Sequence, residues 1–309
     1  MSRLPTGRSR AVTVLAVISV IVGLWPALGR AQTPTPEPVI DSAPRLVGFS
    51  TKATIRGHLE DGTPGDEVLL QRRRGERDWN TVAERTVSSD EHFKFRRRDM
   101  RKSTFYRLVW KDEATGVRTK SDTARVEVRP RLTFRVKPRH VYRGRRVRIA
   151  GHLLPTLRER RKVTVEQRVH GRWNAVKRLA VRGGDFSGRI HARHRGHRKL
   201  RLVFGGDKIS ARAKNTKPYT IYEPDPATWY GPGFYGNRTA CGQTLTTGTL
   251  GVAHRTLPCG TSVSLLYRGR TVTVRVIDRG PYSSADWDLT RRTAERLRFS
   301  GKDDVGVTR

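Results

Sequence analysis

Three short motifs recur in this chain at a constant offset of 94 residues. The first copies occupy residues 55–59, 79–80 and 106–110, and the second copies occupy residues 149–153, 173–174 and 200–204. Each set begins with Ile-x-Gly-His-Leu, continues with Trp-Asn and ends with Arg-Leu-Val before an aromatic residue. Random similarity rarely keeps one offset through three motifs, so the sequence predicts a tandem duplication of a unit of about 90 residues.

Apolar and polar residues alternate within both copies, and turns rich in Gly, Pro and Asp separate the alternating stretches. Residues 126–128 and 163–169 alternate with period 2, while residues 61–65 and 183–185 have the composition of turns. This pattern is typical of a β-sandwich. Both copies resemble bacterial immunoglobulin-like modules, without the paired cysteines of antibody domains.

Tryptophan and histidine each recur at one repeat position. Trp79 and Trp173 are expected to pack in or beside the two cores rather than to bind a ligand. His58 and His152 also correspond to one another, which favours a structural role over a metal site. No constellation of metal ligands or cofactor-binding residues is visible in the sequence, so no metal and no cofactor are expected.

The first 31 residues have the pattern of an export signal. Arg3, Arg8 and Arg10 make a positive start, and the uncharged apolar run 11–24 follows. That run is short for a bilayer span, which needs about 20 residues, so cleavage is favoured over retention as a membrane anchor. Residues 32–44, which contain Thr-Pro-Thr-Pro-Glu-Pro, are predicted to be a semi-rigid spacer.

Positive charge is concentrated in the second copy. The chain has a formal net charge of +35, and residues 131–222 hold 27 Lys and Arg against 4 Asp and Glu. Such an excess attracts a polyanion. In an exported protein the accessible polyanions are anionic cell-wall polymers, acidic glycans and lipid head groups, so nucleic acid is not an expected partner. The alternative is a surface that arginine solvates without any ligand.

Cys241 and Cys259 are the only cysteines of the chain. An even number of cysteines in an exported protein predicts a disulfide bond. Closing the loop between them would contribute about 3 kcal/mol in the chain-entropy model. Two cysteines without a second pair of ligands make a poor zinc site.

In residues 223–309, Gly-rich motifs surround a predicted hairpin, one short helix and a last strand. The hairpin joins residues 262–267 to residues 271–277. A helix is expected next, and its buried face would consist of Leu289, Thr293, Ala294 and Leu297. Residues 305–308 have the pattern of a final strand.

The motifs of this segment resemble, in order and spacing, the RlpA family (rare lipoprotein A-like, septal-ring lytic transglycosylases). The shared string is A-x-W-Y-G, T-A-x-G, A-H-x-T-L-P-x-G-T, V-I-D-R-G-P-Y and D-L-T, over about the last 80 residues. The resemblance implies a double-psi β-barrel with one short helix over residues 223–309. The expected fold class is therefore all-β, with two tandem immunoglobulin-like sandwiches, residues 45–130 and 131–222, before the barrel.

The resemblance also implies an activity. Lytic transglycosylases of this family cleave peptidoglycan glycan strands between N-acetylmuramic acid and N-acetylglucosamine and leave a 1,6-anhydro ring. Glycan strands would then be the substrate of an exported, cell-wall-associated chain. The catalytic positions of the family motif fall on His254 and Asp278, and Gln243 stands where the family usually has Glu. A neutral amide can orient a sugar but cannot exchange a proton.

The distribution of carboxylates gives a partly independent argument. No Asp or Glu lies between Trp229 and Ile277, whereas glycosidases that use water generally need two carboxylates. One carboxyl group suffices for the anhydro ring, because it can protonate the leaving oxygen and then accept the proton of the C6 hydroxyl. Asp278 is the candidate, although it could instead bind backbone N–H groups. Asp288 is predicted to cap the helix that follows.

Three further residues complete the candidate site. Trp229 and Tyr230 could stack on sugar rings or belong to the barrel core. Arg279 could pair with Asp278 or bind a substrate carboxylate. His254 could relay or stabilise charge, or act only in the structure.

Two other functions remain open from the sequence. The first is a non-catalytic glycan-binding or wall-loosening module like the barrel of expansins. The second is endoglucanase-like hydrolysis, which would need a second carboxylate facing Asp278. The sequence indicates no oligomeric state.

Overall fold

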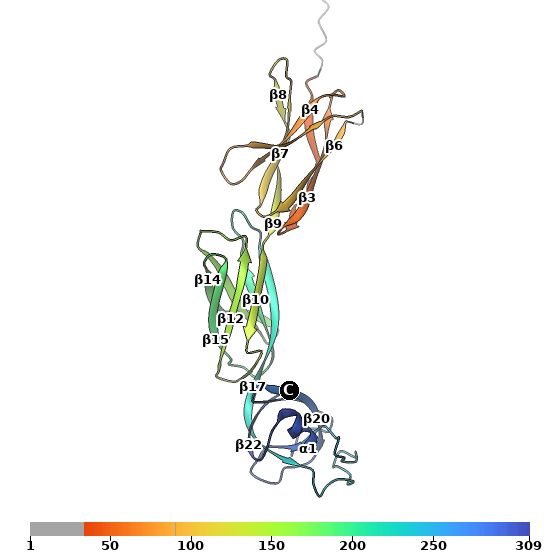
Figure 1. Cartoon of the computed structure of the whole chain (residues 1–309), viewed down its shortest axis with the longest axis vertical. Helices are drawn as coiled ribbons and strands as arrows, with labels where there is room; N and C mark the ends of the chain where they lie inside the picture. The colour runs from red at the N-terminus through yellow and green to blue at the C-terminus, as the bar shows by residue number, and fades with distance from the viewer. Residues whose placement is uncertain (1–33, 90) are drawn as a thin grey trace, which may run out of the picture. The chain divides into compact units, whose positions relative to one another are not determined.

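The computed structural model describes residues 34–89 and 91–309, and the predicted export signal, residues 1–31, lies outside them. The described residues form twenty-two β-strands and one short helix, so the all-β prediction is confirmed (Figure 1). Among these residues no helix has both the length and the apolar character that crossing a membrane requires.

The first sandwich consists of two sheets that enclose one core. The smaller sheet has the order β1 (Glu37–Ser42), β3 (Thr51–Glu60), β6 (His92–Met100). The larger sheet has the order β2 (Leu46–Gly48), β9 (Ala124–Arg129), β7 (Thr104–Lys111), β4 (Glu67–Arg73), β5 (Asn80–Thr86), and β8 (Arg118–Lys120) pairs with β7. The core takes apolar side chains from both sheets, among them Ile55, Leu70, Phe95, Tyr106 and Leu108.

Strand β1 changes one predicted boundary. The sequence predicts a spacer over residues 32–44, but residues 37–42 pair with β3 in antiparallel register. Ile40 packs against the core, and this burial outweighs the extended, unpaired preference of a Pro-rich segment. Pro38 is tolerated because β1 lies at the edge of its sheet, where a missing N–H removes no necessary ladder bond.

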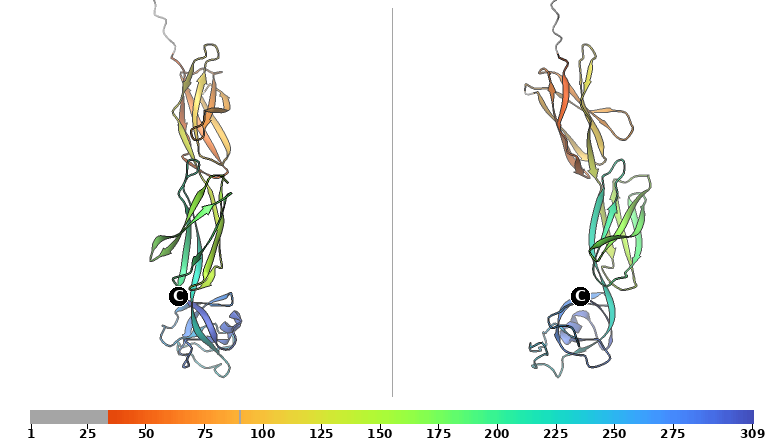
Figure 2. Two further views of the ribbon diagram at one scale, coloured as in Figure 1. Left: turned by 90° about the vertical axis from the view of Figure 1, so that its left-hand side faces the viewer. Right: turned by 180° about the vertical axis from the view of Figure 1, so that it is seen from behind.

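The second sandwich repeats this arrangement (Figure 2). Its smaller sheet has the order β10 (Arg131–Lys137), β12 (Arg146–Leu154), β15 (Asp185–His191). Its other sheet has the order β14 (Arg172–Val181), β13 (Arg161–Val169), β16 (Gly196–Phe204), β17 (Ala213–Tyr230), and β11 (His140–Tyr142) pairs with β17. The core includes Ile149, Val165, Leu200, Leu202 and Ile221.

The duplicated motifs occupy equivalent places in the two sandwiches. Ile-x-Gly-His-Leu lies on the central strand of each smaller sheet, β3 or β12. A Cβ at Gly57 or Gly151 would lie 2.3 Å or 2.1 Å from a carbonyl oxygen of the neighbouring strand, so only glycine fits there. The half-buried rings of Trp79 and Trp173 lie under the guanidinium groups of Arg107 and Arg201, at 4.3 and 4.2 Å.

The C-terminal domain is a closed barrel of six strands. The order is β17, β21 (Trp287–Thr290), β18 (Val252–Ala253), β20 (Arg270–Asp278), β19 (Ser262–Tyr267), β22 (Asp303–Thr308), and β22 pairs again with β17. The pairs β17–β21 and β18–β20 are parallel, and the remaining pairs are antiparallel. The predicted double-psi barrel, its hairpin and its last strand are confirmed. The core includes Val263, Leu265, Val276, Leu289 and Val305.

The helix α1 (Arg291–Leu297) begins later than the sequence predicts, after the first residue of its expected buried face. Thr293, Ala294 and Leu297 are buried as expected, whereas Leu289 belongs to strand β21. The helix begins after Thr290, whose side chain accepts a hydrogen bond from the main-chain N–H of Thr293.

No linker separates the second sandwich from the barrel. The expected boundary between residues 222 and 223 falls inside β17, which continues from Ala213 to Tyr230. Up to Ile221 this strand pairs with β16, from Glu223 it pairs with β22, and its last residues pair with β21.

Candidate active site

Two carboxylates flank the short strand β18. Ala253 pairs with Asp278 at the end of β20 on one side and with Asp288 in β21 on the other. Residues opposite one another across a sheet present their side chains on the same face. The barrel therefore places Asp278 and Asp288 on one face, although ten positions separate them in the sequence.

The carboxylate of Asp278 accepts three hydrogen bonds. Its Oδ1 accepts from the main-chain N–H of Ala240 at 2.8 Å and of Arg279 at 2.9 Å. Its Oδ2 accepts from the hydroxyl of Tyr230 at 3.3 Å. Burial raises the pKa of Tyr230, and the nearby charge of Asp278 raises it further, so the phenol remains a donor. The end of β17, the loop after β20 and the 239–243 turn thus each provide one donor to Asp278.

Asp288 has a different environment. Burial raises the pKa of Asp288, the hydrogen bond that the Thr228 hydroxyl donates to Oδ1 at 2.8 Å lowers it, and the charge of Asp278 raises it again. The net result is a carboxyl group that holds its proton to higher pH than an ordinary aspartate. Asp288 does not cap the helix, as the sequence suggests, because Thr290 has that position.

His254 is neutral and has a defined tautomer. Its Nδ1 accepts hydrogen bonds from the main-chain N–H groups of Thr256 and Leu257, both at 3.1 Å, which leaves the proton on Nε2. Burial lowers the pKa of His254, and neighbouring arginines lower it further. The ring lies against Trp287, with centroids 4.5 Å apart. His254 can therefore donate through Nε2 but does not bring a positive charge to the site.

The predicted disulfide is present and supports the Asp278 contacts. Cys241 and Cys259 are joined with their Cα atoms 5.7 Å apart. Cys241 directly follows Ala240, whose N–H donates to Asp278. In the same turn the main-chain N–H of Thr239 donates to the carbonyl of Gln243 at 2.8 Å, and the side chain of Gln243 is exposed.

Two arginines brace the loops around Asp278. The guanidinium of Arg279 donates to the carbonyl of Leu257 at 3.0 Å, while its main-chain N–H binds Asp278. Arg255 Nε donates to the carbonyl of Pro281 at 2.9 Å, and its Nη2 donates to the carbonyl of Ser283 at 3.0 Å. The structure thus directs the Arg279 side chain to the backbone and not to the carboxylate of Asp278.

The aromatic residues of the site divide between two faces of β17. Thr228 and Tyr230 lie on the face with the carboxylates, so Trp229 between them points the other way, with 37% of its surface exposed. Phe234 packs edge-on against Tyr230, with ring centroids 6.1 Å apart, and is 56% exposed. Tyr282, four residues after Asp278, is 91% exposed.

Sequence reasoning missed several of these residues for a physical reason. Asp288, Thr228, Phe234 and Tyr282 lie within the matched motifs or beside them, but their roles depend on burial and on strand register. The D-L-T string at residues 288–290 was the available signal for Asp288.

Comparisons with known proteins bear on this domain. Residues 226–308 match a family model described as lytic transglycolase. The chain is 52% identical over 59 residues to the probable endolytic peptidoglycan transglycosylase RlpA of Synechocystis sp., a match that covers 18% of this chain and 18% of that protein. It is 39% identical over 112 residues to the endolytic peptidoglycan transglycosylase RlpA of Campylobacter jejuni, covering 30% of this chain and 41% of the relative.

The chain spans less than half the length of these curated relatives. The RlpA-like recognition of the C-terminal barrel is confirmed. The family model does not extend to the sandwiches, so their immunoglobulin-like resemblance stays a prediction.

Replacing both Cys241 and Cys259 by Ala should lower the stability of the barrel by about 3 kcal/mol, because the unfolded loop regains its entropy. Differential scanning calorimetry with and without a reducing agent measures this. The reductant should destabilise the parent protein and leave the double variant unaffected. Free thiols in the untreated protein, or equal stability of the two proteins, would contradict the expectation.

Proposed function

We propose that this chain, which carries an RlpA-like lytic transglycosylase barrel at its C-terminal end, is an exported cell-wall enzyme that cleaves peptidoglycan glycan strands. The bond cleaved lies between N-acetylmuramic acid and N-acetylglucosamine, and the product has a 1,6-anhydro ring. The observation that carries the proposal is the pair Asp278 and Asp288, of which one accepts three hydrogen bonds and the other has a raised pKa. The two relatives named above are endolytic peptidoglycan transglycosylases, which supports the substrate class.

The two carboxyl groups have separate roles in this proposal. Asp288 keeps its proton and delivers it to the glycosidic oxygen as the bond to the anomeric carbon C1 breaks. The C6 hydroxyl oxygen then bonds to C1 and its proton passes to the carboxylate of Asp288. The proton is thereby returned, and no water is consumed. The sequence alone favours Asp278 for this proton, but the surroundings of Asp288 suit it better.

Asp278 supplies the negative charge. It faces the positive charge that develops at C1 in an oxocarbenium-like transition state, and it helps to keep Asp288 protonated. Its three donors hold the oxygens in place, so little reorganisation is needed during the reaction.

The remaining residues would bind the sugar chain. His254 donates through Nε2 to a sugar oxygen, and the exposed amide of Gln243 orients a sugar from the neighbouring turn. Phe234 and Tyr282 offer exposed rings on which sugars stack, with Tyr230 between Phe234 and Asp278. Trp229 would contact a glycan chain that continues around the end of β17.

A non-catalytic glycan-binding module is the second candidate function. The observation that favours it is Gln243, an amide where the resembled family usually carries a carboxylate. Such a barrel would hold the same glycan through its exposed aromatic rings without cleaving it.

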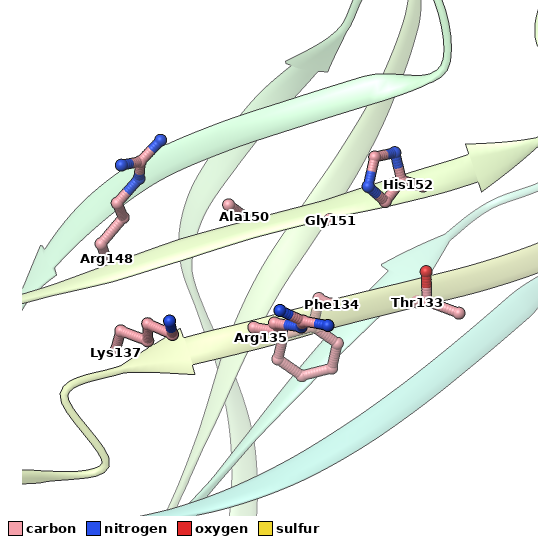
Figure 3. A pocket seen from close by; sticks show the side chains of 8 residues that line it. All are labelled: Thr133, Phe134, Arg135, Lys137, Arg148, Ala150, Gly151 and His152. Atoms are coloured by element: carbon pink, nitrogen blue, oxygen red, sulfur yellow. The ribbon is translucent and has the colours of Figure 1, made fainter.

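The second sandwich would retain the protein on an anionic wall polymer. Arg135 and Lys137 from β10 and Arg148 from β12 surround a pocket on its smaller sheet, with His152 at the other end (Figure 3). Lys137, Arg148 and Arg189 lie side by side in one row across the three strands.

This row is costly without a ligand. Like charges directly opposite one another on a sheet destabilise it, and none of the three side chains pairs with a carboxylate among the described residues. Phosphate groups of an anionic polymer would neutralise the row, which favours a polyanion over a surface that is merely solvated.

The first test compares Asp278→Asn and Asp288→Asn with the parent on peptidoglycan glycan stripped of stem peptides, with products identified by mass spectrometry. The parent should yield anhydro-muramyl ends. Each variant should lose activity by about 10²- to 10⁴-fold, because a proton donor or its charge partner is gone. Asp304→Asn, an exposed carboxylate of the same barrel, is the matched control and should stay active.

The products decide between the candidates. Reducing ends in place of anhydro ends indicate hydrolysis. If the protein binds the glycan but cleaves none of it, the enzymatic function is contradicted and the binding module is favoured.

The pH profile tests which carboxyl group carries the proton. Asp288 acts in its protonated form, so activity should fall as pH rises through its raised pKa. Thr228→Val removes a hydrogen bond that lowers this pKa, so the alkaline limb should move to higher pH. A limb that stays in place in Thr228→Val argues against Asp288 as the acid.

For the basic sheet, sedimentation with purified cell walls across a salt series is the measurement. Binding should weaken as salt rises and as the anionic polymer is extracted, because exposed charges are screened. Combining Lys137→Gln, Arg148→Gln and Arg189→Gln should weaken binding. Combining Lys162→Gln, Arg178→Gln and Lys199→Gln removes equal charge from the other sheet and should not. Salt-independent binding would refute the electrostatic account.

A further inference from the structure

Three metal-ligating side chains meet on the smaller sheet of the first sandwich. His58 on β3 and His92 on β6 are directly opposite in the antiparallel register. Asp41 lies at the irregularity of β1 between Ile40 and Ser42, next to the strand that carries His58. All three strands of the sheet thus contribute one ligand each, although the residues are 17 and 34 positions apart in the sequence.

We propose that Asp41, His58 and His92 bind one divalent transition-metal ion of the zinc type. The Nδ1 of His58 lies 2.6 Å from Oδ1 of Asp41, and the Nδ1 of His92 lies 3.8 Å from Oδ2 of Asp41. One ligand atom from each residue lies within 4.8 Å of the other two. Around a tetrahedral zinc ion with bonds of about 2.0–2.1 Å, ligand atoms are about 3.3 Å apart, so small side-chain rotations complete the site.

The donor set specifies the class of ion. Two imidazoles and one carboxylate suit zinc and its neighbours better than magnesium or calcium, which prefer oxygen ligands. Three protein ligands leave one position open to solvent or to a ligand. The site lies at the surface, where His92 is exposed and His58 is half-buried, so an ion can enter without any opening of the fold.

The charges and contacts around the ligands also fit. Glu60 Oε1 lies 3.6 Å from the second ring nitrogen of His58, in the place of the carboxylates that orient metal-bound histidines. Arg56 and Lys94 line a pocket with Asp41 and His92 and bring positive charge to the same face. Asp41 and Glu60 offset these two cations locally, which keeps a divalent ion acceptable.

The second sandwich provides an internal comparison. His152 corresponds to His58 and contacts Asp185, the residue opposite it on β15. Where β1 carries Asp41, the equivalent position of β10 is Arg135. The second copy therefore keeps a histidine–carboxylate pair but has an arginine and no second imidazole, so it cannot form the three-ligand set. The recurring histidine is structural in the second copy, as the sequence predicts for both, and a ligand in the first.

An ion at this site would join all three strands of the sheet. β1 and β6 are the two edges, and β3 lies between them. β1 is also the first strand of the described residues, and the ion would fasten it to the other two strands of its sheet. A ligand that binds the folded state and not the unfolded state raises the unfolding temperature with its concentration.

Isothermal titration of the metal-free protein with ZnCl₂ tests the proposal, together with calorimetric unfolding and the visible absorption of the Co²⁺ form. We expect one bound ion per chain, a higher unfolding temperature in zinc and the absorption bands of tetrahedral Co²⁺. His92→Gln and Asp41→Asn should each weaken binding at least tenfold. Both residues are exposed, so these variants should fold.

His152→Gln is the matched control at the same repeat position and should bind like the parent. No binding at 100 μM zinc, or parental binding by His92→Gln, would overturn the proposal. Loss of binding in His152→Gln would do the same, because it would place the ion elsewhere. The readouts involve no glycan cleavage, so they stand apart from the test of the barrel.

Discussion

The hydrogen bonds of β17 serve both the second sandwich and the barrel. Its first part completes a sheet of the second sandwich and buries Tyr219 and Ile221 in that core. Its last part closes the barrel between β21 and β22. Because side chains alternate along a strand, a slip of one residue would turn each buried set outward. Two cores therefore fix one register, and that register brings Thr228 and Tyr230 to Asp288 and Asp278.

The chemistry proposed for the site depends on the different surroundings of two aspartates, Asp278 and Asp288. Asp278 ends its strand in a loop where main-chain N–H groups point toward it. Asp288 stays inside a strand with one hydroxyl partner, and burial raises its pKa. Raising the pKa of one carboxyl group of a pair is one way in which a protein obtains a proton donor beside a second residue of the same type. The neutral His254 fits this arrangement, since it adds a donor without adding charge.

The parts of the fold that could be predicted from the sequence are those whose signal lies in residues close together along the chain. The duplication, the hairpin, the last strand and the disulfide each depend on spacing or alternation that is visible locally. What the sequence missed depends on which residues become neighbours across strands. His92 and Asp41 have no local signal that links them to His58, and only the register of β1, β3 and β6 does so. Asp288 has the local pattern of a helix cap, but the helix begins after Thr290. The spacer and the domain boundary were misplaced because burial in a core overrides the preferences of proline-rich segments at β1 and β17.

The bridge between Cys241 and Cys259 gives the barrel a dependence on its chemical surroundings. The bridge holds the turn whose N–H donates to Asp278, so the carboxylate of Asp278 has its full set of donors held in place only after the two thiols have been oxidised. A newly made chain in a reducing compartment carries the same residues with that turn untethered. Under the function proposed above, export would precede oxidation, and the site would take its final form only where the proposed substrate lies.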